Sequence, residues 1–130
     1  MTQEELNEIL KKHKQWLYDE EGGERADLKN ADLRGADLKN ADLTCVNMTG
    51  ADLTDACLHG AELIFANLMG ACLQGADLID ADLMYTNLHN ADLRGAHLER
   101  AIFTVSEKSK DLILKLAEDI KKSEEEEKQQ

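Results

Sequence analysis

Cysteine, aspartate and histidine recur at one regular spacing in this chain, and together they are the residue types of a nucleophile site. Asp37, Cys57, Asp77 and His97 stand twenty residues apart. A thiol beside a histidine base that a carboxylate orients is the usual arrangement of a cysteine nucleophile. The same residues suggest metal ligands, either His97 with Asp77 or Cys57 with His59. Whether either chemistry is available depends on the elements that carry these side chains.

Those elements are set by a five-residue repeat that runs without an insertion from Ala26 to Val105. The central residue is Leu in 14 of the 16 copies, with Met48 and Phe103 as the exceptions. On an α-helix, steps of five residues would place these leucines about 140° apart, and on a flat strand they would alternate between faces. All of them can point inward only if the chain bends by a fixed angle after each short extended piece. The pattern therefore predicts a solenoid.

A second period, of twenty residues, appears at the fifth position of the repeat. Eleven of the 16 residues there are Gly, Asn or Asp, which tolerate a positive φ in tight turns. Four of the five exceptions stand twenty residues apart: Cys45, Phe65, Tyr85 and Val105. Asn47, Asn67 and Asn87 recur with the same period, and we expect their amides to stack as a ladder. Coils of four repeats account for this period, so we predict four coils and a rod of about 19 Å at ~4.8 Å per coil.

The repeats follow the motif A(D/N)LXX, and over residues 26–105 the chain resembles the pentapeptide-repeat family. The lead-in GGERADL is also similar to that of small stand-alone bacterial and phage members. The resemblance implies a right-handed quadrilateral β-helix of four coils. We therefore predict an all-β solenoid with terminal helices. Residues 1–25 would form a capping helix and lead-in, residues 26–105 the β-helix, and residues 106–130 a helix followed by a frayed acidic tail.

This architecture argues against the nucleophile site. Cys57 and His97 would lie two coils apart, near 10 Å, whereas a working pair needs hydrogen-bond reach of about 3 Å. We therefore predict no enzyme, no catalytic residue, no cofactor and no metal site. The Asp residues at the second position of each repeat are instead expected to bond backbone groups in the turns.

Both ends of the rod would expose open strand edges, which the termini are expected to cover. Thr2 with Glu5 indicates a capping box. The helix that follows carries one apolar stripe: Leu6, Ile9, Leu10, His13, Trp16 and Leu17. We expect this stripe to lie across the first coil, with Trp16 as its anchor. A second helix, from Ser106 or Ser109 to about Ile120, carries the stripe Leu112, Ile113, Leu116 and Ile120.

One outward column is apolar, although outward positions of a solvated rod should be polar. This interaction patch comprises Cys45, Ile64, Phe65, Met84, Tyr85 and Val105. We expect the patch to be covered by the carboxy-terminal helix or by a second subunit, which would make a homodimer. A bare binding surface for another protein is the remaining alternative.

Charge and composition limit the location and the partners. The net charge of −12 argues against direct binding of nucleic acid or an anionic membrane, because both are polyanions. The amino-terminal sequence MTQEELNEIL does not resemble a signal peptide, and no stretch reaches the ~18 apolar residues of a membrane helix. Three cysteines without a disulfide or zinc spacing indicate free thiols, so we expect a cytoplasmic protein.

The function predicted from the sequence is a non-enzymatic scaffold or protein-interaction module with an unknown protein partner. The family resemblance implies one alternative, a DNA mimic that inhibits or protects a type II topoisomerase such as gyrase. A rod of about 19 Å spans only half of a ~34 Å DNA turn, which weakens that alternative. A dimer joined end to end through the carboxy-terminal helices would restore the length.

Overall fold

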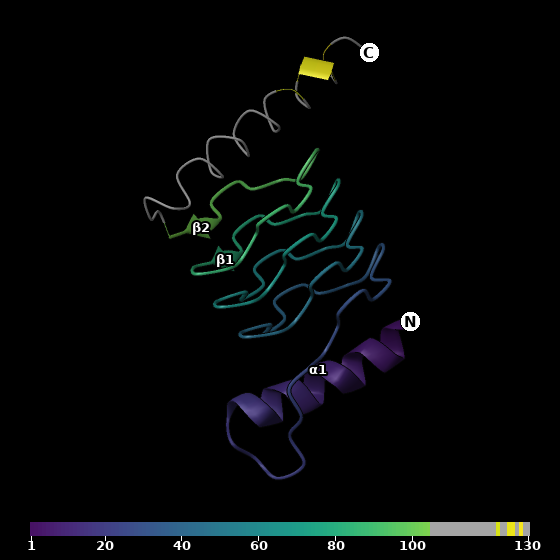
Figure 1. Ribbon diagram of the computed structural model, residues 1–130, viewed down its shortest axis with the longest axis vertical. Helices are drawn as coiled ribbons and strands as arrows, with labels where there is room; N and C mark the ends of the chain where they lie inside the picture. The colour runs from purple at the N-terminus through teal and green to yellow at the C-terminus, as the bar shows by residue number, and fades with distance from the viewer. Residues whose placement is uncertain (105–121, 123–124, 127, 129–130) are drawn as a thin grey trace.

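The computed structural model describes residues 1–104 together with residues 122, 125, 126 and 128. A single α-helix, α1 (Gln3–Leu17), precedes a repeat region whose regular strands are β1 (Asp82–Leu83) and β2 (Ile102–Phe103). Figure 1 shows the repeat region as a stack of coils with α1 lying across its first coil. Helix α1 begins where the sequence predicts, because the hydroxyl of Thr2 accepts a hydrogen bond from the Glu5 N–H at 3.1 Å.

Each repeat ends in a tight turn of one kind. Every fifth-position residue from 30 to 100 has a φ between +57° and +73°. The next repeat's first N–H donates back to the carbonyl of the central residue, as from Ala31 to the Leu28 oxygen at 3.1 Å. A positive φ at the third residue of a four-residue turn, closed by this bond, is the signature of a type II turn. The turns therefore explain why Gly, Asn and Asp dominate the fifth position.

The coils are joined by parallel pairing at a spacing of twenty residues, as the sequence predicts. Bridges link Asp27 to Asn47 and Asp32 to Asp52, and the same offset continues to β1 and β2, where Asp82 pairs with Ile102. A repeat contributes only two or three paired residues before the next turn, which keeps the strands short. We number the four repeats of each coil as sides one to four, so that side one begins at residue 26 and side four at residue 41.

The interior contains the central residues of the repeats, as predicted. The leucines from Leu28 to Leu93 and Met48 are buried, whereas Leu98 and Phe103 in the last coil are partly buried. First-position alanines fill the space beside them. Stacked aliphatic rungs fill this core, so it needs no aromatic ring.

Second-position Asp side chains hold the turns, as predicted, and the Asn side chains at this position do the same. All eleven accept a hydrogen bond from the N–H two residues later, as Asp27 does from Lys29 at 3.1 Å. The predicted amide ladder is wrong in its bonding. The side-chain oxygens of Asn47, Asn67 and Asn87 bond within their own turns, and no hydrogen bond within the described chain joins one amide to the next.

Helix α1 supplies the hydrogen bonds that a further coil would have made. The Gln3 amide donates to the Asp37 carbonyl at 2.9 Å and accepts from the Asp37 N–H at 3.0 Å. His13, which is 0% exposed, accepts from the Ala26 N–H at Nδ1 and donates through Nε2 to the Thr44 carbonyl at 2.8 Å. The side chains of α1 thus replace two backbone rungs at the open edge of the first coil.

The prediction that Trp16 anchors this helix is wrong. Trp16 is 40% exposed and stacks on the outer side of His13, with ring centroids 5.6 Å apart. An imidazole can accept one hydrogen bond and donate another in the narrow space beside coil one, whereas an indole is larger and has only a donor. Leu6 is buried in the core with Ile9 and Leu10 packed against it, and Leu17 is half-buried.

Candidate functional site

The column that suggested a nucleophile does not form a catalytic group. Asp37, Cys57, Asp77 and His97 are successive parallel neighbours on side three, so a whole coil separates Cys57 from His97. His59 lies near two carboxylates: its Nδ1 is 3.8 Å from an oxygen of Asp77, and its Nε2 is 3.7 Å from an oxygen of Asp80. Within the described residues, no group of three His, Cys, Asp or Glu side chains could hold a metal ion.

Two aromatic side chains of the predicted patch meet on one edge of the rod. Phe65 and Tyr85 stack with ring centroids 4.9 Å apart and planes 9° from parallel. They are 59% and 56% exposed. We call this pair the aromatic corner, because both residues occupy the turn between sides four and one.

The backbone at the aromatic corner is left-handed, with φ of +58° at Phe65 and +59° at Tyr85. Such a conformation suits Gly and is uncommon for a bulky residue, where it costs on the order of 1–3 kcal/mol. Gly occupies the equivalent turn position six times in the described coils. The aromatic residues are therefore held at strained positions without the compensation of full burial.

The other patch residues surround this pair. Ile64 and Met84 are half-buried one residue before each ring, and Cys45 is half-buried one coil below Phe65. The Tyr85 N–H donates to the Thr104 hydroxyl at 3.2 Å, so the described coils end beside the corner. Val105 and the predicted helix contacts lie outside the described residues: Leu112, Ile113, Leu116 and Ile120.

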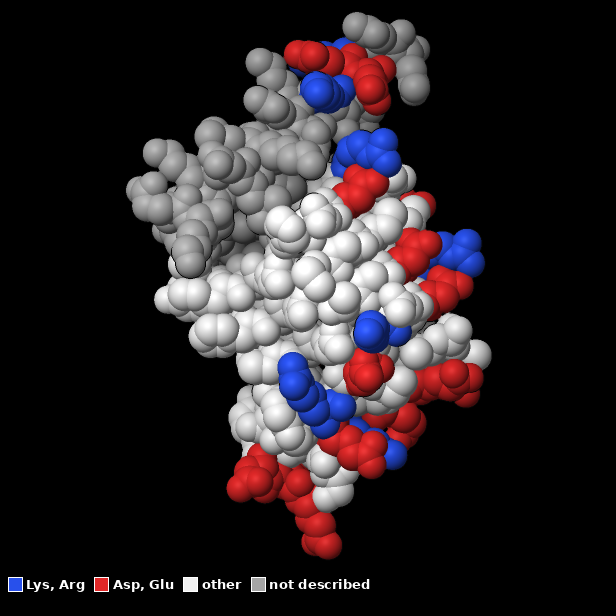
Figure 2. Space-filling view, in the orientation of Figure 1, with Lys and Arg blue, Asp and Glu red and all other residues white. Residues whose placement is uncertain are grey.

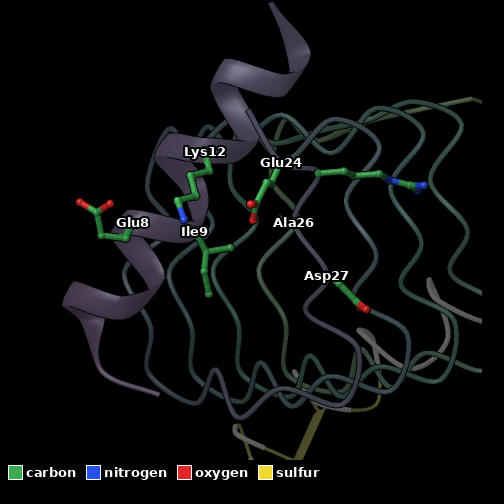
Figure 3. Close-up of a pocket in the computed structure, with 7 residues that line it drawn as sticks. Glu8, Ile9, Lys12, Glu24, Ala26 and Asp27 are labelled. Atoms are coloured by element: carbon green, nitrogen blue, oxygen red, sulfur yellow. The ribbon is translucent and has the colours of Figure 1, made fainter. Parts of the chain in front are cut away.

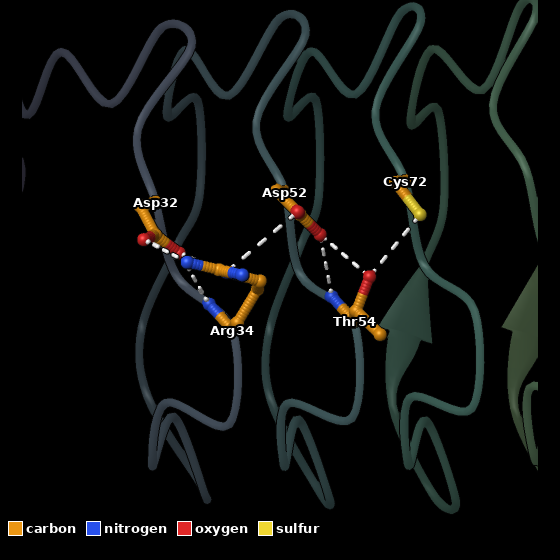
Figure 4. A network of polar contacts seen from close by, with 5 residues as sticks. All are labelled: Asp32, Arg34, Asp52, Thr54 and Cys72. Atoms are coloured by element: carbon orange, nitrogen blue, oxygen red, sulfur yellow. Dashed lines mark hydrogen bonds and ion pairs between the residues drawn. The ribbon is translucent and has the colours of Figure 1, made fainter.

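Two arginines pair with three of the four carboxylates on side two. Figure 4 shows Arg34 binding Asp32 through two hydrogen bonds of 2.8 Å while it also lies 3.9 Å from Asp52. The hydrogen bonds from Arg34 hold the pKa of Asp32 well below its usual range, and those from Thr54 lower the pKa of Asp52. Asp92 is paired in the same way with Arg94, which lowers the pKa of that carboxyl.

On side three, the Arg100 guanidinium donates to Asp80 at 2.6 Å and lowers the pKa of that carboxyl. The charged side chains are unevenly distributed over the molecule. In Figure 2, a broad uncharged area covers the coils facing the viewer, and acidic and basic groups gather along one edge and at the α1 end.

A hollow of about 290 Å³ lies between α1 and the start of the first coil (Figure 3). Ile9 and Ala26 line it, and acidic and basic side chains surround it, among them Glu8 and Lys12. The Glu24 N–H bonds the Lys12 carbonyl at 3.0 Å and fixes one wall. The hollow brings together no pair of groups suited to acid–base or nucleophilic chemistry.

The sequence pattern did not reveal the clamping roles of Gln3 and His13. His13 was expected only as part of an apolar stripe, and Gln3 carried no signal, because its partner Asp37 is 34 residues away. A polar residue within an apolar stripe is the one local sign that could have marked His13 as a hydrogen-bonding group.

Comparisons with known proteins agree with this architecture. A family model described as pentapeptide repeats (8 copies) matches residues 24–60 and 61–104. A pentapeptide repeat protein from the Arabidopsis thaliana thylakoid lumen is 27% identical, with a TM-score of 0.56, over 70% of this chain and 72% of that one. One from the cyanobacterium Nostoc is 36% identical, with a TM-score of 0.42, over 72% of this chain and 77% of that one.

QnrB1, a plasmid-mediated fluoroquinolone resistance protein, is 22% identical with a TM-score of 0.24, over 73% of this chain and 70% of that one. A likeness of this size says nothing about partners. No curated protein matches the chain significantly. Within the described residues, no helix has the length and apolar character needed to cross a membrane. Because the family model matches across the coils described above, this chain belongs to the pentapeptide-repeat family.

Proposed function

We propose that this protein is a non-enzymatic scaffold that binds another protein through the aromatic corner. A right-handed quadrilateral β-helix, the form implied by the family, would hold the corner rigidly. The observation that supports the proposal is the pair of stacked, exposed rings at Phe65 and Tyr85 on left-handed backbone. Strain retained at an exposed site is a feature of functional surfaces rather than of packing.

The chemistry of the remaining surface is consistent with a scaffold. The second-position aspartates bond their own turns, and Asp32 and Asp92 are also paired with arginine, so they are poorly placed to act as acids or bases. The thiols of Cys45, Cys57 and Cys72 are free, and the cytoplasmic location that belongs to this proposal would keep them reduced.

Site-specific photo-crosslinking in cells tests the binding proposal. A photoreactive phenylalanine analogue at position 65 should cross-link to a discrete partner, and the same analogue at position 35, a turn of side two, should not. The captured protein must then bind the purified chain and lose binding to the double variant Phe65→Gly, Tyr85→Gly. Glycine suits the left-handed backbone, so this variant keeps the turns. Equal cross-linking at both positions would contradict the proposal.

A DNA mimic acting on a type II topoisomerase is the second candidate. The supporting observation is that carboxylates stack in columns along the rod, such as Asp32 with Asp52. The coils of residues 26–105 carry 12 acidic and 5 basic residues, a net charge of −7 over about 19 Å. Duplex DNA carries one charge per about 1.7 Å, and the arginine pairs dilute the columns further. A gyrase supercoiling assay decides this point, because a mimic must change the supercoiling rate at micromolar protein.

A further inference from the structure

Side four combines three kinds of side chain in adjacent columns. Its second positions form an acidic column, Asp42, Glu62 and Asp82, in which each residue is the parallel neighbour of the next. The apolar side chains of Ile64 and Met84 come two residues further along the chain, followed by the aromatic corner. An acidic edge, an apolar strip and an aromatic ridge therefore run side by side along the rod.

Within the described residues, the acidic column has no paired cation. No ion pair in the described part of the chain involves Asp42, Glu62 or Asp82, whereas the column on side two is paired with Arg34 and Arg94. Asp42 and Asp82 each use one oxygen to hold the turn and keep a second oxygen for another donor. Arg25 bonds the Cys45 carbonyl of side four at 2.9 Å but pairs with none of the three carboxylates, so the described part of the chain leaves the column with its negative charge.

Beyond the aromatic corner, the second and third coils carry no charged residue on side one. The run from residue 63 to residue 76 contains no Asp, Glu, Lys or Arg, and it places Asn67 and Met69 on side one next to the corner. Interface cores are depleted in charge and enriched in aromatic residues and Met. The corner thus has a neutral flank on side one and an acidic flank on side four.

We infer that side four and the aromatic corner bind a basic amphipathic helix of a partner protein. The apolar face of such a helix would lie on Ile64, Met84 and the two rings. Its lysines or arginines would face the acidic column. The column spans about 10 Å over two coil steps, which matches basic residues seven apart on a helix, at about 10.5 Å. This inference rests on the proposed function and names the chemistry of its partner.

Charge complementarity favours this occupant over two others. A second copy of the chain carries a net charge of −12 and would bring like charge to an acidic surface. The chain's own residues 106–120 contain four acidic residues and three lysines, so they also lack the required positive charge.

Binding of a synthetic helix to the full-length chain tests the inference. The probe is a fluorescent peptide of two LKKLLKL units, and its matched control has Glu in place of every Lys. Fluorescence anisotropy should show binding of the basic peptide only, weakening as salt is raised. The triple variant Asp42→Asn, Glu62→Gln, Asp82→Asn should lower the affinity by about tenfold or more, and so should Phe65→Gly with Tyr85→Gly.

The control variant Asp32→Asn, Asp52→Asn, Asp92→Asn removes the same charge from side two and should change the affinity by less than about twofold. Asparagine can accept the same turn hydrogen bond, as Asn47 does, so folding is preserved in the Asp→Asn variants. Equal weakening by both triple variants would mean non-specific attraction and overturn the inference. Binding of the acidic peptide would also overturn it. So would a dimer, detected by analytical ultracentrifugation, that becomes a monomer in the double variant Phe65→Gly, Tyr85→Gly.

If the variant Leu116→Asp bound the basic peptide more tightly than the unchanged chain, the chain's own segment would occupy the surface. That result would also overturn the inference. These outcomes are separable from failure of the proposed function. A partner cross-linked at position 65 that lacks a basic helix would leave the scaffold proposal standing and remove only this inference.

Discussion

At the residue scale, the second position of the repeat shows what one oxygen atom contributes. Asp and Asn side chains there accept a hydrogen bond from an N–H of the turn. Cys57 and Cys72 have no comparable oxygen. Among the described residues, Glu62 and His97 make no such bond either. The turns after these four residues therefore have one hydrogen bond fewer than their neighbours. A net hydrogen bond of this kind contributes about 0.5–1.5 kcal/mol.

Replacing Cys57 with Asn should therefore stabilise the protein. The new side chain would accept from the His59 N–H as Asn47 accepts from Thr49 at 3.1 Å. Asn is preferred to Asp here, because Asp37 and Asp77 are the parallel neighbours of Cys57. We expect the free energy of unfolding, measured with urea, to be about 0.5–1.5 kcal/mol higher than that of Cys57→Ala, which has no acceptor. Equal urea midpoints of unfolding for Cys57→Asn and Cys57→Ala would contradict this explanation.

At the scale of elements, α1 is held to the rod by polar groups as much as by apolar ones. Gln3 and His13 together bond four backbone atoms of the first coil region. Gly23 allows the lead-in to return against the helix, because a Cβ at that position would collide with the backbone of Trp16. The helix thus closes a strand edge that would otherwise be open to another chain.

Loss of the His13 side chain should loosen this cap. His13→Ala would leave the Ala26 N–H and the Thr44 carbonyl without partners in a buried place, at a cost of about 2–4 kcal/mol. Trp16→Ala should cost less, since Trp16 is 40% exposed. Chemical unfolding gives both free energies, and hydrogen exchange should show faster exchange of Ala26 in the His13 variant. A larger loss of unfolding free energy for Trp16→Ala than for His13→Ala would show that Trp16 is the anchor of the helix.

At the scale of the whole molecule, stability depends on pH through the paired carboxylates. The pKa values of Asp32, Asp52, Asp80 and Asp92 are all lowered in the folded chain, first by hydrogen bonds from Arg34, Thr54, Arg100 and Arg94 in that order. Groups with a lowered folded pKa bind fewer protons in the folded state than in the unfolded state. Their contribution is therefore complete above the ordinary carboxyl pKa of about 3.9 and is lost as the pH falls below it.

We accordingly expect the melting temperature to be nearly constant from pH 7 to about pH 5 and to fall below about pH 4. The variant Arg34→Gln, Arg94→Gln removes the main cause of two of the lowered pKa values. Its melting temperature should fall less steeply between pH 4 and pH 2 than that of the unchanged chain. Differential scanning calorimetry at several pH values measures both curves, and identical slopes would show that the arginine pairs do not cause the pH dependence.

Several features of the molecule are local enough to be predicted from the sequence. The five-residue spacing of leucine requires a bend after each short step, and the twenty-residue spacing of Cys45, Phe65 and Tyr85 defines the size of the coil. The choice of Gly, Asn or Asp in the turns follows from the left-handed backbone there. These predictions were correct because each repeat contacts only its neighbours, so the pattern contains most of the geometry.

The amino-acid sequence by itself determined the inward leucines, the stacking of one coil on the next and the Asp bonds in the turns. Only the tertiary structure decided that His13 rather than Trp16 is clamped under α1, that Gln3 pairs with Asp37, and which carboxylates lack an arginine. The physical reason is distance along the chain. Backbone groups at an open edge and charges on neighbouring coils meet partners about twenty or more residues away, and their pairing depends on how the side chains are oriented in three dimensions.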